Sequence, residues 1–117
     1  MSVTLAIETS QHIGSVAVRD RGGVIQTESL SQKKRHDDDL LPAIDRLFAR
    51  CGYKPKDLKQ GAVAVSIGPG GFTGLRIAVA TAKMFAEALG AKVIAVPSAL
   101  VAAESSTSQG GSNALLI

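Results

Sequence analysis

The glycine-rich stretch GPGG, followed by FTG up to Gly74, contains the residues best suited to hold a phosphate. Glycines allow the backbone to approach a ligand closely, and exposed N–H groups at the start of a following helix attract anions. A nucleotide-binding P-loop ends in Gly-Lys-Ser or Gly-Lys-Thr, whereas this stretch ends in TGLR and the nearest lysine is Lys83. The pattern excludes a P-loop NTPase. It leaves open a weak anion site at Gly70 and Gly71, or a tight strand-to-helix turn in which Phe72 fills the core.

A second candidate site is formed by Glu8, Thr9 and Ser10, at the end of the apolar segment VTLAIET. In actin-like ATPases and sugar kinases, an acidic residue and a hydroxyl-bearing hairpin at this place contact metal and phosphate. The alternative is an ordinary hairpin whose Thr and Ser side chains bond to their own backbone. Because no second phosphate loop accompanies the segment, we favour the hairpin and regard any phosphate loop here as vestigial.

The helix expected from Gly74 to Leu89 carries few polar side chains. Arg76, Lys83 and Glu87 share one narrow stripe of the helix surface. One apolar face can pack on a sheet, and the rest of the surface is too apolar for a helix that faces water. Either further parts of the protein or another subunit must cover this remaining surface. We favour a subunit interface formed by Arg76, Ala78, Val79, Ala82, Lys83 and Ala86.

The other reactive side chains form no recognisable catalytic or metal-binding pattern. His12 and His36 lack a second ligand at metal-binding spacing, and the single cysteine, Cys51, excludes an intrachain disulfide. Ser66 and Ser98 have no identifiable base, and no Gly-x-Ser-x-Gly motif is present. We therefore expect no metal site, no catalytic residue and no resident cofactor.

The charge pattern offers little support for direct nucleic-acid binding. The basic run Lys33–Arg35 is closely followed by the acidic run Asp37–Asp39, and only net neutralisation of phosphates strengthens binding. Aromatic residues make up 3% of the chain, too few for a platform on which bases stack. Direct contact with tRNA through the basic run is therefore a less favoured alternative.

Hydrophobic periodicity and turn residues place these motifs on an α/β fold. Two segments, Val3–Thr9 and Ala62–Ile67, are apolar on both faces, as central strands are, whereas Val24–Leu30 carries the polar residues of an edge strand. The remaining expected elements are strands at Ser15–Arg19 and Lys92–Val96, a helix that follows Asp37–Asp39, has Pro42 in its first turn and ends at Cys51, the helix Gly74–Leu89, and a short helix over Pro97–Ala103. This order predicts half of an actin-like ATPase (ribonuclease-H-like) fold. Such a half has a mixed five-stranded sheet, with three antiparallel strands, then two parallel strands, and helices on both faces.

The length of 117 residues suits one small domain. We expect a lobe over residues 1–104, a flexible Ser- and Gly-rich connector over 105–112, and a strand over 113–117 that opens a second lobe. The chain is therefore expected to be a piece of a longer protein. The first residues lack the regions of a signal peptide, and no apolar run reaches the length of a membrane span. These features predict a cytoplasmic protein that contacts no membrane.

Three segments carry a resemblance to a known family: LAIETS, RHDDDLLPAIDRLF and AVSIGPGGFTGLRIAVATAKMFAEALG. They resemble the TsaB (YeaZ) family, bacterial non-catalytic subunits of the tRNA threonylcarbamoyladenosine machinery, which older classification groups with glycoprotease-like M22 peptidases. The resemblance covers nearly the whole chain and is most specific in GPGGFTGLR and the alanine-rich helix. Two departures stand out: the family usually has Asp where Glu8 stands, and the metal-binding histidines of the catalytic paralogue have no equivalent here.

The resemblance implies a scaffold or activator rather than an enzyme. It implies binding to a catalytic paralogue, TsaD, and to an ATPase, TsaE, in the transfer of threonylcarbamoyl to adenosine 37 of tRNAs that decode ANN codons. ATP or ADP would bind only at the interface with the catalytic partner, and tRNA would be reached indirectly through the complex. Alone, the subunit would form a homodimer through the helix after FTGLR. The alternative is an actin-like enzyme: a small-molecule kinase, an ATPase or an M22-type metallopeptidase.

Overall fold

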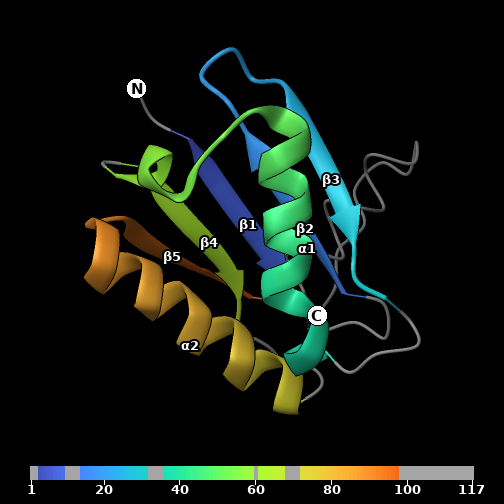
Figure 1. The fold of residues 1–117 in the computed structure, drawn as a ribbon. Helices are drawn as coiled ribbons and strands as arrows, with labels where there is room; N and C mark the ends of the chain where they lie inside the picture. Colours follow the sequence, from blue (N-terminus) through green and yellow to red (C-terminus); the bar gives the residue numbers. More distant parts are fainter. Residues whose placement is uncertain (1–2, 10–13, 32–35, 60, 68–71, 98–117) are drawn as a thin grey trace, which may run out of the picture.

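The fold is a five-stranded mixed sheet with two long helices against it (Figure 1). The computed structural model describes residues 3–9, 14–31, 36–59, 61–67 and 72–97. The predicted connector and second-lobe strand, and the predicted short helix after Pro97, lie outside these residues. In chain order the elements are β1 (Thr4–Glu8), β2 (Ser15–Arg19), β3 (Ile25–Ser29), α1 (His36–Cys51), the 3-10 helix η1 (Pro55–Leu58), β4 (Ala62–Ser66), α2 (Phe72–Leu89) and β5 (Lys92–Val96).

The strand order in the sheet is β3-β2-β1-β4-β5. The first three strands pair antiparallel as a meander, and β4 and β5 pair parallel to β1. The central place of β1 and the edge place of β3 confirm what their residue patterns predicted. The two parallel strands also confirm the predicted actin-like half, because each is reached through a helical crossover.

One face of the sheet carries the core. Alternate residues of the central strands point into it and are at most 2% exposed: Leu5, Ile7, Val16, Val18, Val63 and Val65. Both described helices cover this same face, with α1 over β2 and β3, α2 over β4 and β5, and the two helices in contact (Figure 1). The prediction placed helices on both faces. Among the described residues, the opposite face is covered by neither helix.

Each long helix ends at a glycine with a positive φ angle. Gly52 follows α1 with φ of 79°, and Gly90 follows α2 with φ of 75°, as their sequence positions predicted. The start of α1 differs from the prediction, because the helix begins at His36. Pro42 therefore lies within the second turn of α1 and not in the first. The 3-10 helix η1, which the sequence did not predict, contributes the fully buried Leu58 to the core.

None of the helices in the described part of the chain has the length and apolar character that a membrane span requires.

Candidate functional site

The hydroxyl group of Thr9 is committed to the fold. Thr9 is 1% exposed, and its Oγ1 donates a hydrogen bond of 2.7 Å to the carbonyl oxygen of Gly74 in the first turn of α2. A hydroxyl that is buried and bonded in this way does not reach a phosphate in solvent. Of the other residues predicted for a vestigial phosphate site, Ser10, Gly70 and Gly71 lie outside the described residues.

Glu8 lies beside Thr9 but on the other face of the sheet. It is half-buried and borders a hollow of about 130 Å³ at the carboxyl ends of the central strands; the lining residues are Ala6, Ile7, Glu8, Ala64, Val65, Ser66 and Val96. No lysine or arginine of the described residues lines it. A carboxylate and a buried serine hydroxyl do not supply the positive potential that a phosphate needs. The described residues of this hollow therefore do not fit a nucleotide phosphate.

Metal-binding side chains do not gather in the described part of the chain. No group of three or more His, Cys, Asp or Glu residues lies close enough there to hold an ion. Of the residues considered in the sequence, Cys51 is a free, partly exposed thiol next to Gly52, and His12 lies outside the described residues.

The residues that were predicted to form an interface on α2 differ in their burial. Ala78 and Ala82 are 0% exposed and pack against the sheet, so they cannot contact another subunit, and this part of the prediction was wrong. Val79 and Ala86 are partly buried, whereas Arg76 and Lys83 are exposed. The four-residue spacing of the alanines therefore begins on the buried face of α2, at Ala78 and Ala82, and reaches the partly buried Ala86.

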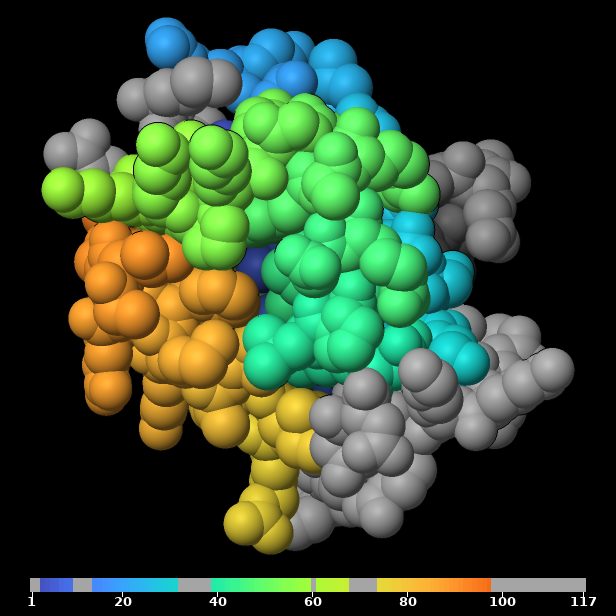
Figure 2. All heavy atoms as spheres, in the orientation of Figure 1, coloured from blue at the N-terminus to red at the C-terminus, as the bar shows by residue number. Residues whose placement is uncertain are grey.

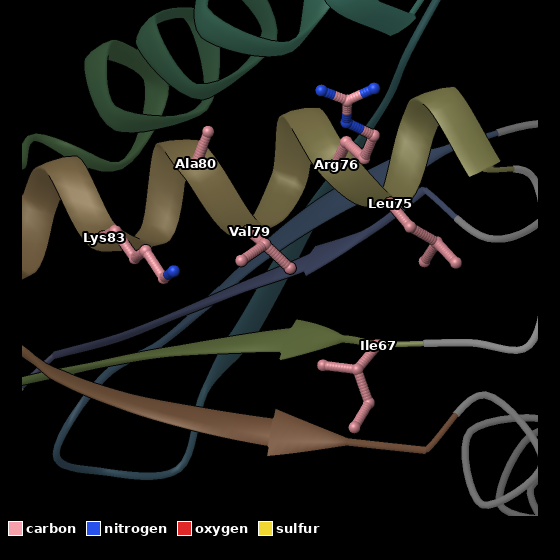
Figure 3. A pocket seen from close by; sticks show the side chains of 6 residues that line it. All are labelled: Ile67, Leu75, Arg76, Val79, Ala80 and Lys83. Atoms are coloured by element: carbon pink, nitrogen blue, oxygen red, sulfur yellow. The ribbon is translucent and has the colours of Figure 1, made fainter.

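Three of the predicted interface residues come together at a surface hollow of about 510 Å³. Arg76, Val79 and Lys83 line it with Leu75, Ala80 and the exposed Ile67 at the end of β4. Figure 3 shows Leu75, Val79 and Lys83 pointing from α2 toward the strands, with Arg76 and Ala80 on the other side of the helix. The lining of the hollow is mainly apolar, and its charged side chains are those of Arg76 and Lys83.

A second, narrower groove runs between α1 and α2, and we call it the interhelical groove. Its volume is about 190 Å³, and its lining residues are Leu41, Ile44, Asp45, Phe48, Pro55, Met84 and Phe85. Leu41 is 50% exposed and Met84 is 45% exposed, so each helix presents a large apolar side chain to solvent at this groove. In Figure 2 the seam between the two helices is visible on the face of the molecule that they form. The sequence analysis did not single out this pair, because Leu41 and Met84 come together only in the tertiary structure.

A cluster of charged residues, which the sequence analysis also missed, ties β3 to α1. Asp39 is 1% exposed, and its Oδ2 accepts hydrogen bonds from the Ser31 N–H at 2.6 Å and from Arg46 at 3.3 Å. Arg46 also donates to Glu28 at 3.0 Å, and Arg50 donates to Glu28 at 2.7 Å. The hydrogen bond from Arg46 is the main cause that lowers the pKa of Glu28. These hydrogen bonds join the edge strand β3 to α1.

The sequence of the chain matches the model of a known protein family. The family model described as "TsaD: tRNA N6-adenosine threonylcarbamoyltransferase" matches residues 12–117. The chain belongs to this family.

Relatives within the family carry the names TsaB and YeaZ. The "tRNA threonylcarbamoyladenosine biosynthesis protein TsaB" of Bacillus subtilis (strain 168) is 36% identical over 94 residues, which are 80% of this chain and 40% of that protein. The protein of the same name from Haemophilus influenzae is 34% identical over 93 residues, which are 80% of this chain and 37% of that protein. The solved structure of YeaZ from Pseudomonas aeruginosa superposes with a TM-score of 0.80 and 33% identity, over 94% of this chain and 50% of that chain.

These relatives confirm the TsaB (YeaZ) resemblance and the fold that it implies. The chain spans about 40% of the length of the Bacillus subtilis relative and half of the solved structure. The most specific segment of the resemblance, GPGGFTGLR, leads into α2, the helix that forms one wall of the interhelical groove.

Proposed function

We propose that the protein containing this chain is a non-catalytic subunit in the biosynthesis of threonylcarbamoyladenosine in tRNA. The observation that carries the proposal is the match to proteins named TsaB over 80% of the chain. In this proposal the subunit binds the catalytic paralogue, TsaD, and supports its transfer of threonylcarbamoyl to adenosine 37. The ATPase TsaE joins the complex, tRNA is contacted through it, and the assembly acts in the cytoplasm.

The interhelical groove supports a role in protein binding. Leu41 and Met84 are each about half exposed on neighbouring helices, although apolar side chains of this size gain free energy when they are buried. A helix from another subunit can fill such a groove, with its apolar residues between the two walls. We propose that the catalytic paralogue occupies the groove and that, without it, a second copy of the subunit does so. Any ATP or ADP would bind at that partner interface, because the described residues around Glu8 and Thr9 do not fit a phosphate.

A second candidate function has one observation in its favour. The matching family model is described as the transferase itself, which favours catalysis by the protein that contains this chain. The actin-like fold is compatible with either function, because a fold does not determine an activity.

Reconstitution separates the two candidates. The full-length protein is combined with tRNA and the substrates of the modification, with and without the catalytic paralogue and TsaE, and the tRNA is analysed for threonylcarbamoyladenosine by mass spectrometry of its nucleosides. We expect modification only when the catalytic paralogue is present and a large stimulation by this protein. Modification by this protein alone would replace the scaffold proposal with the catalytic one.

Variants of the groove test where the partner binds. Met84→Glu places a charge in the groove and is expected to weaken binding of the catalytic paralogue at least about tenfold, because a charge at the centre of an interface is desolvated without a partner. The matched control is Val24→Glu, which changes an apolar residue that is 58% exposed and lies between β2 and β3, outside the groove. Equal binding by the two variants would place the interface elsewhere.

A further inference from the structure

The positive charge of the chain is concentrated at one end of the molecule, where β2 ends and where β4 and β5 begin. Six of the 13 basic residues lie in the connections at this end or at the strand ends beside them. We call these six residues the basic end: Arg19, Arg21, Lys54, Lys56, Lys59 and Lys92. The same connections hold only two of the 10 acidic residues, Asp20 and Asp57. Over the rest of the chain, basic and acidic residues nearly balance.

The sheet places the two outer residues of the basic end in one row. Arg19 pairs with Thr4 of β1. The partner of Thr4 on β4 is Ala62, which in turn pairs with Lys92 of β5. Neighbouring strands lie about 4.8 Å apart, so three steps across the sheet separate the backbones of Arg19 and Lys92 by about 14 Å.

The three lysines belong to the connection between α1 and β4, which reaches the same end of the sheet. Lys54 and Lys59 flank η1, and Lys56 lies within it. The connection is bonded to the start of β5, because the N–H of Lys92 donates to the carbonyl oxygen of Gly61 at 2.9 Å. Figure 1 shows the turn between β2 and β3, which carries Arg21, at this end as well.

Tyr53 indicates that the turn between β2 and β3 and the 3-10 helix lie within electrostatic reach of one another. The pKa of Tyr53 is raised first by burial, and then by the charges of Asp20, Cys51 and Asp57. Asp20 belongs to the turn and Asp57 belongs to η1. Charges of both connections therefore act on the same small region of the molecule.

The two acidic residues serve the local backbone. Asp20 Oδ1 accepts a hydrogen bond of 3.0 Å from the Val24 N–H, and Asp57 Oδ2 accepts one of 2.8 Å from the Lys54 N–H. All six side chains of the basic end are exposed except where a neighbouring segment shields part of the aliphatic stem. Within the described part of the chain, no residue of the basic end forms an ion pair. The positive charge there is therefore not neutralised by the described residues.

We propose that the basic end binds the phosphate backbone of RNA. This inference rests on the proposed function, because tRNA is the polyanion that such a protein meets. The Debye length is about 10 Å at 0.1 M salt, so the potentials of charges about 14 Å apart overlap between them. Aromatic residues make up 3% of the chain, which favours contacts to phosphates over the stacking of bases.

This surface differs from the basic run Lys33–Arg35 that the sequence analysis considered. Three acids follow that run closely in sequence, whereas the charges of the basic end come from separate connections and meet only in the folded chain. It also differs from the interhelical groove, to which none of its residues contributes. A protein partner in the groove and RNA at the basic end can therefore be tested separately.

The first experiment removes positive charge from the connection between α1 and β4. Full-length protein with Lys54→Gln, Lys56→Gln and Lys59→Gln combined is titrated into fluorescently labelled tRNA at several salt concentrations. At 0.1 M salt, binding should weaken at least about tenfold. The log–log dependence of affinity on salt should flatten by about two, because each phosphate contact contributes about 0.7 to 0.9 to the slope.

The matched control removes the same charge elsewhere. Lys33→Gln, Lys34→Gln and Arg35→Gln combined change the net charge of the protein equally and should weaken tRNA binding much less. Circular dichroism establishes that both triple variants are folded.

The second experiment adds net positive charge, and misfolding cannot imitate its expected result. Asp20→Asn removes a negative charge and keeps a side-chain oxygen that can accept from the Val24 N–H. Binding of tRNA at low salt should strengthen about two- to fivefold. The gain should disappear at high salt, because the added salt screens the charge. If the lysine variant does not fold, this experiment alone decides the question.

The outcomes separate this proposal from the proposed function. Weakening that is specific to the three lysines, or the gain from Asp20→Asn, supports RNA binding at the basic end. No binding of tRNA at low salt, or equal weakening by the two triple variants, overturns it, even where reconstitution yields modified tRNA. Binding to vesicles that contain phosphatidylserine, without binding to tRNA, would assign the surface to membranes and equally overturn it. The titrations use the protein without its catalytic partner, so they remain decisive if the reconstitution fails.

Discussion

The hydroxyl of Thr9 and the carbonyl oxygen of Gly74, 65 residues apart in sequence, are joined by a buried hydrogen bond of 2.7 Å. The bond fastens the end of β1 to the first turn of α2. It therefore helps to set the position of α2, which forms one wall of the interhelical groove. A hydroxyl that the sequence analysis assigned to a hairpin, with a vestigial phosphate loop as the alternative, is in the structure a link between the sheet and a helix.

Loss of this link should destabilise the protein modestly. Thr9→Val keeps the shape of the side chain and removes the donor, and it is expected to lower the free energy of unfolding by about 1 kcal/mol. Chemical denaturation measures the loss, and hydrogen exchange should show faster exchange in the first turn of α2. Unchanged stability and unchanged exchange would mean that the bond does not hold the helix in place.

The core position of Ala82 gives a sharper test of how α2 is oriented. Ala82→Glu should lower the free energy of unfolding by about 4 kcal/mol or more, because Ala82 is 0% exposed and the new charge would have no partner. Ala80→Glu, on the exposed side of the same helix, should change it by less than about 0.5 kcal/mol. Thermal or chemical denaturation compares the two. Equal effects would contradict the orientation of α2 described here.

Gly61 is required by a close approach of two backbone segments. A Cβ atom at this position would lie 2.3 Å from the carbonyl oxygen of Val3, and neither backbone can easily move within the sheet. Gly61→Ala should therefore cost about 1–3 kcal/mol of stability. The control is Gly22→Ala, whose nearest atom is 3.4 Å away on the flexible side chain of Asp20, and we expect no measurable loss. Equal stability of the two variants would show that the sheet relaxes around position 61.

The Glu28 carboxylate should make stability depend on pH in the acidic range. Its pKa is lowered in the folded protein from 4.5, chiefly by the hydrogen bond from Arg46. A lowered pKa contributes stability that is present above the unfolded value and is lost as the pH falls from about 4.5 through the folded value. Glu28→Gln should thus be less stable than the parent at neutral pH, and the difference should shrink below that pH.

Urea denaturation across this pH range, at low and high salt, measures the effect. Added salt should also reduce the difference, because Arg46 and Arg50 are about half exposed. A difference between the two proteins that stays constant from neutral to acidic pH would show that the ionised carboxylate does not carry the stabilisation.

Local patterns in the sequence determined the elements and much of the topology. β1 and β4 are apolar on both faces and lie at the centre of the sheet, the polar Gln26 and Glu28 mark the edge strand, and Gly52 and Gly90 end the helices. These features were predictable because each depends on residues close together in the chain: strand burial on periodicity, and helix ends on backbone conformations that favour glycine. The motif GPGGFTGLR and its helix indicated the family for the same reason.

The tertiary structure alone decided which side chains of these elements are buried and which meet. The polar stripe of α2 is narrow and leaves most of the helix surface apolar, so the sequence alone did not show that Ala78 and Ala82 are buried in the core while Met84 is exposed. The pairing of Leu41 with Met84, of Asp39 with Arg46 and of Thr9 with Gly74 joins residues from different elements or different turns. Such contacts follow from how helices and strands pack against one another, and a period of 2 or 3.6 residues within one element carries no information about its neighbour.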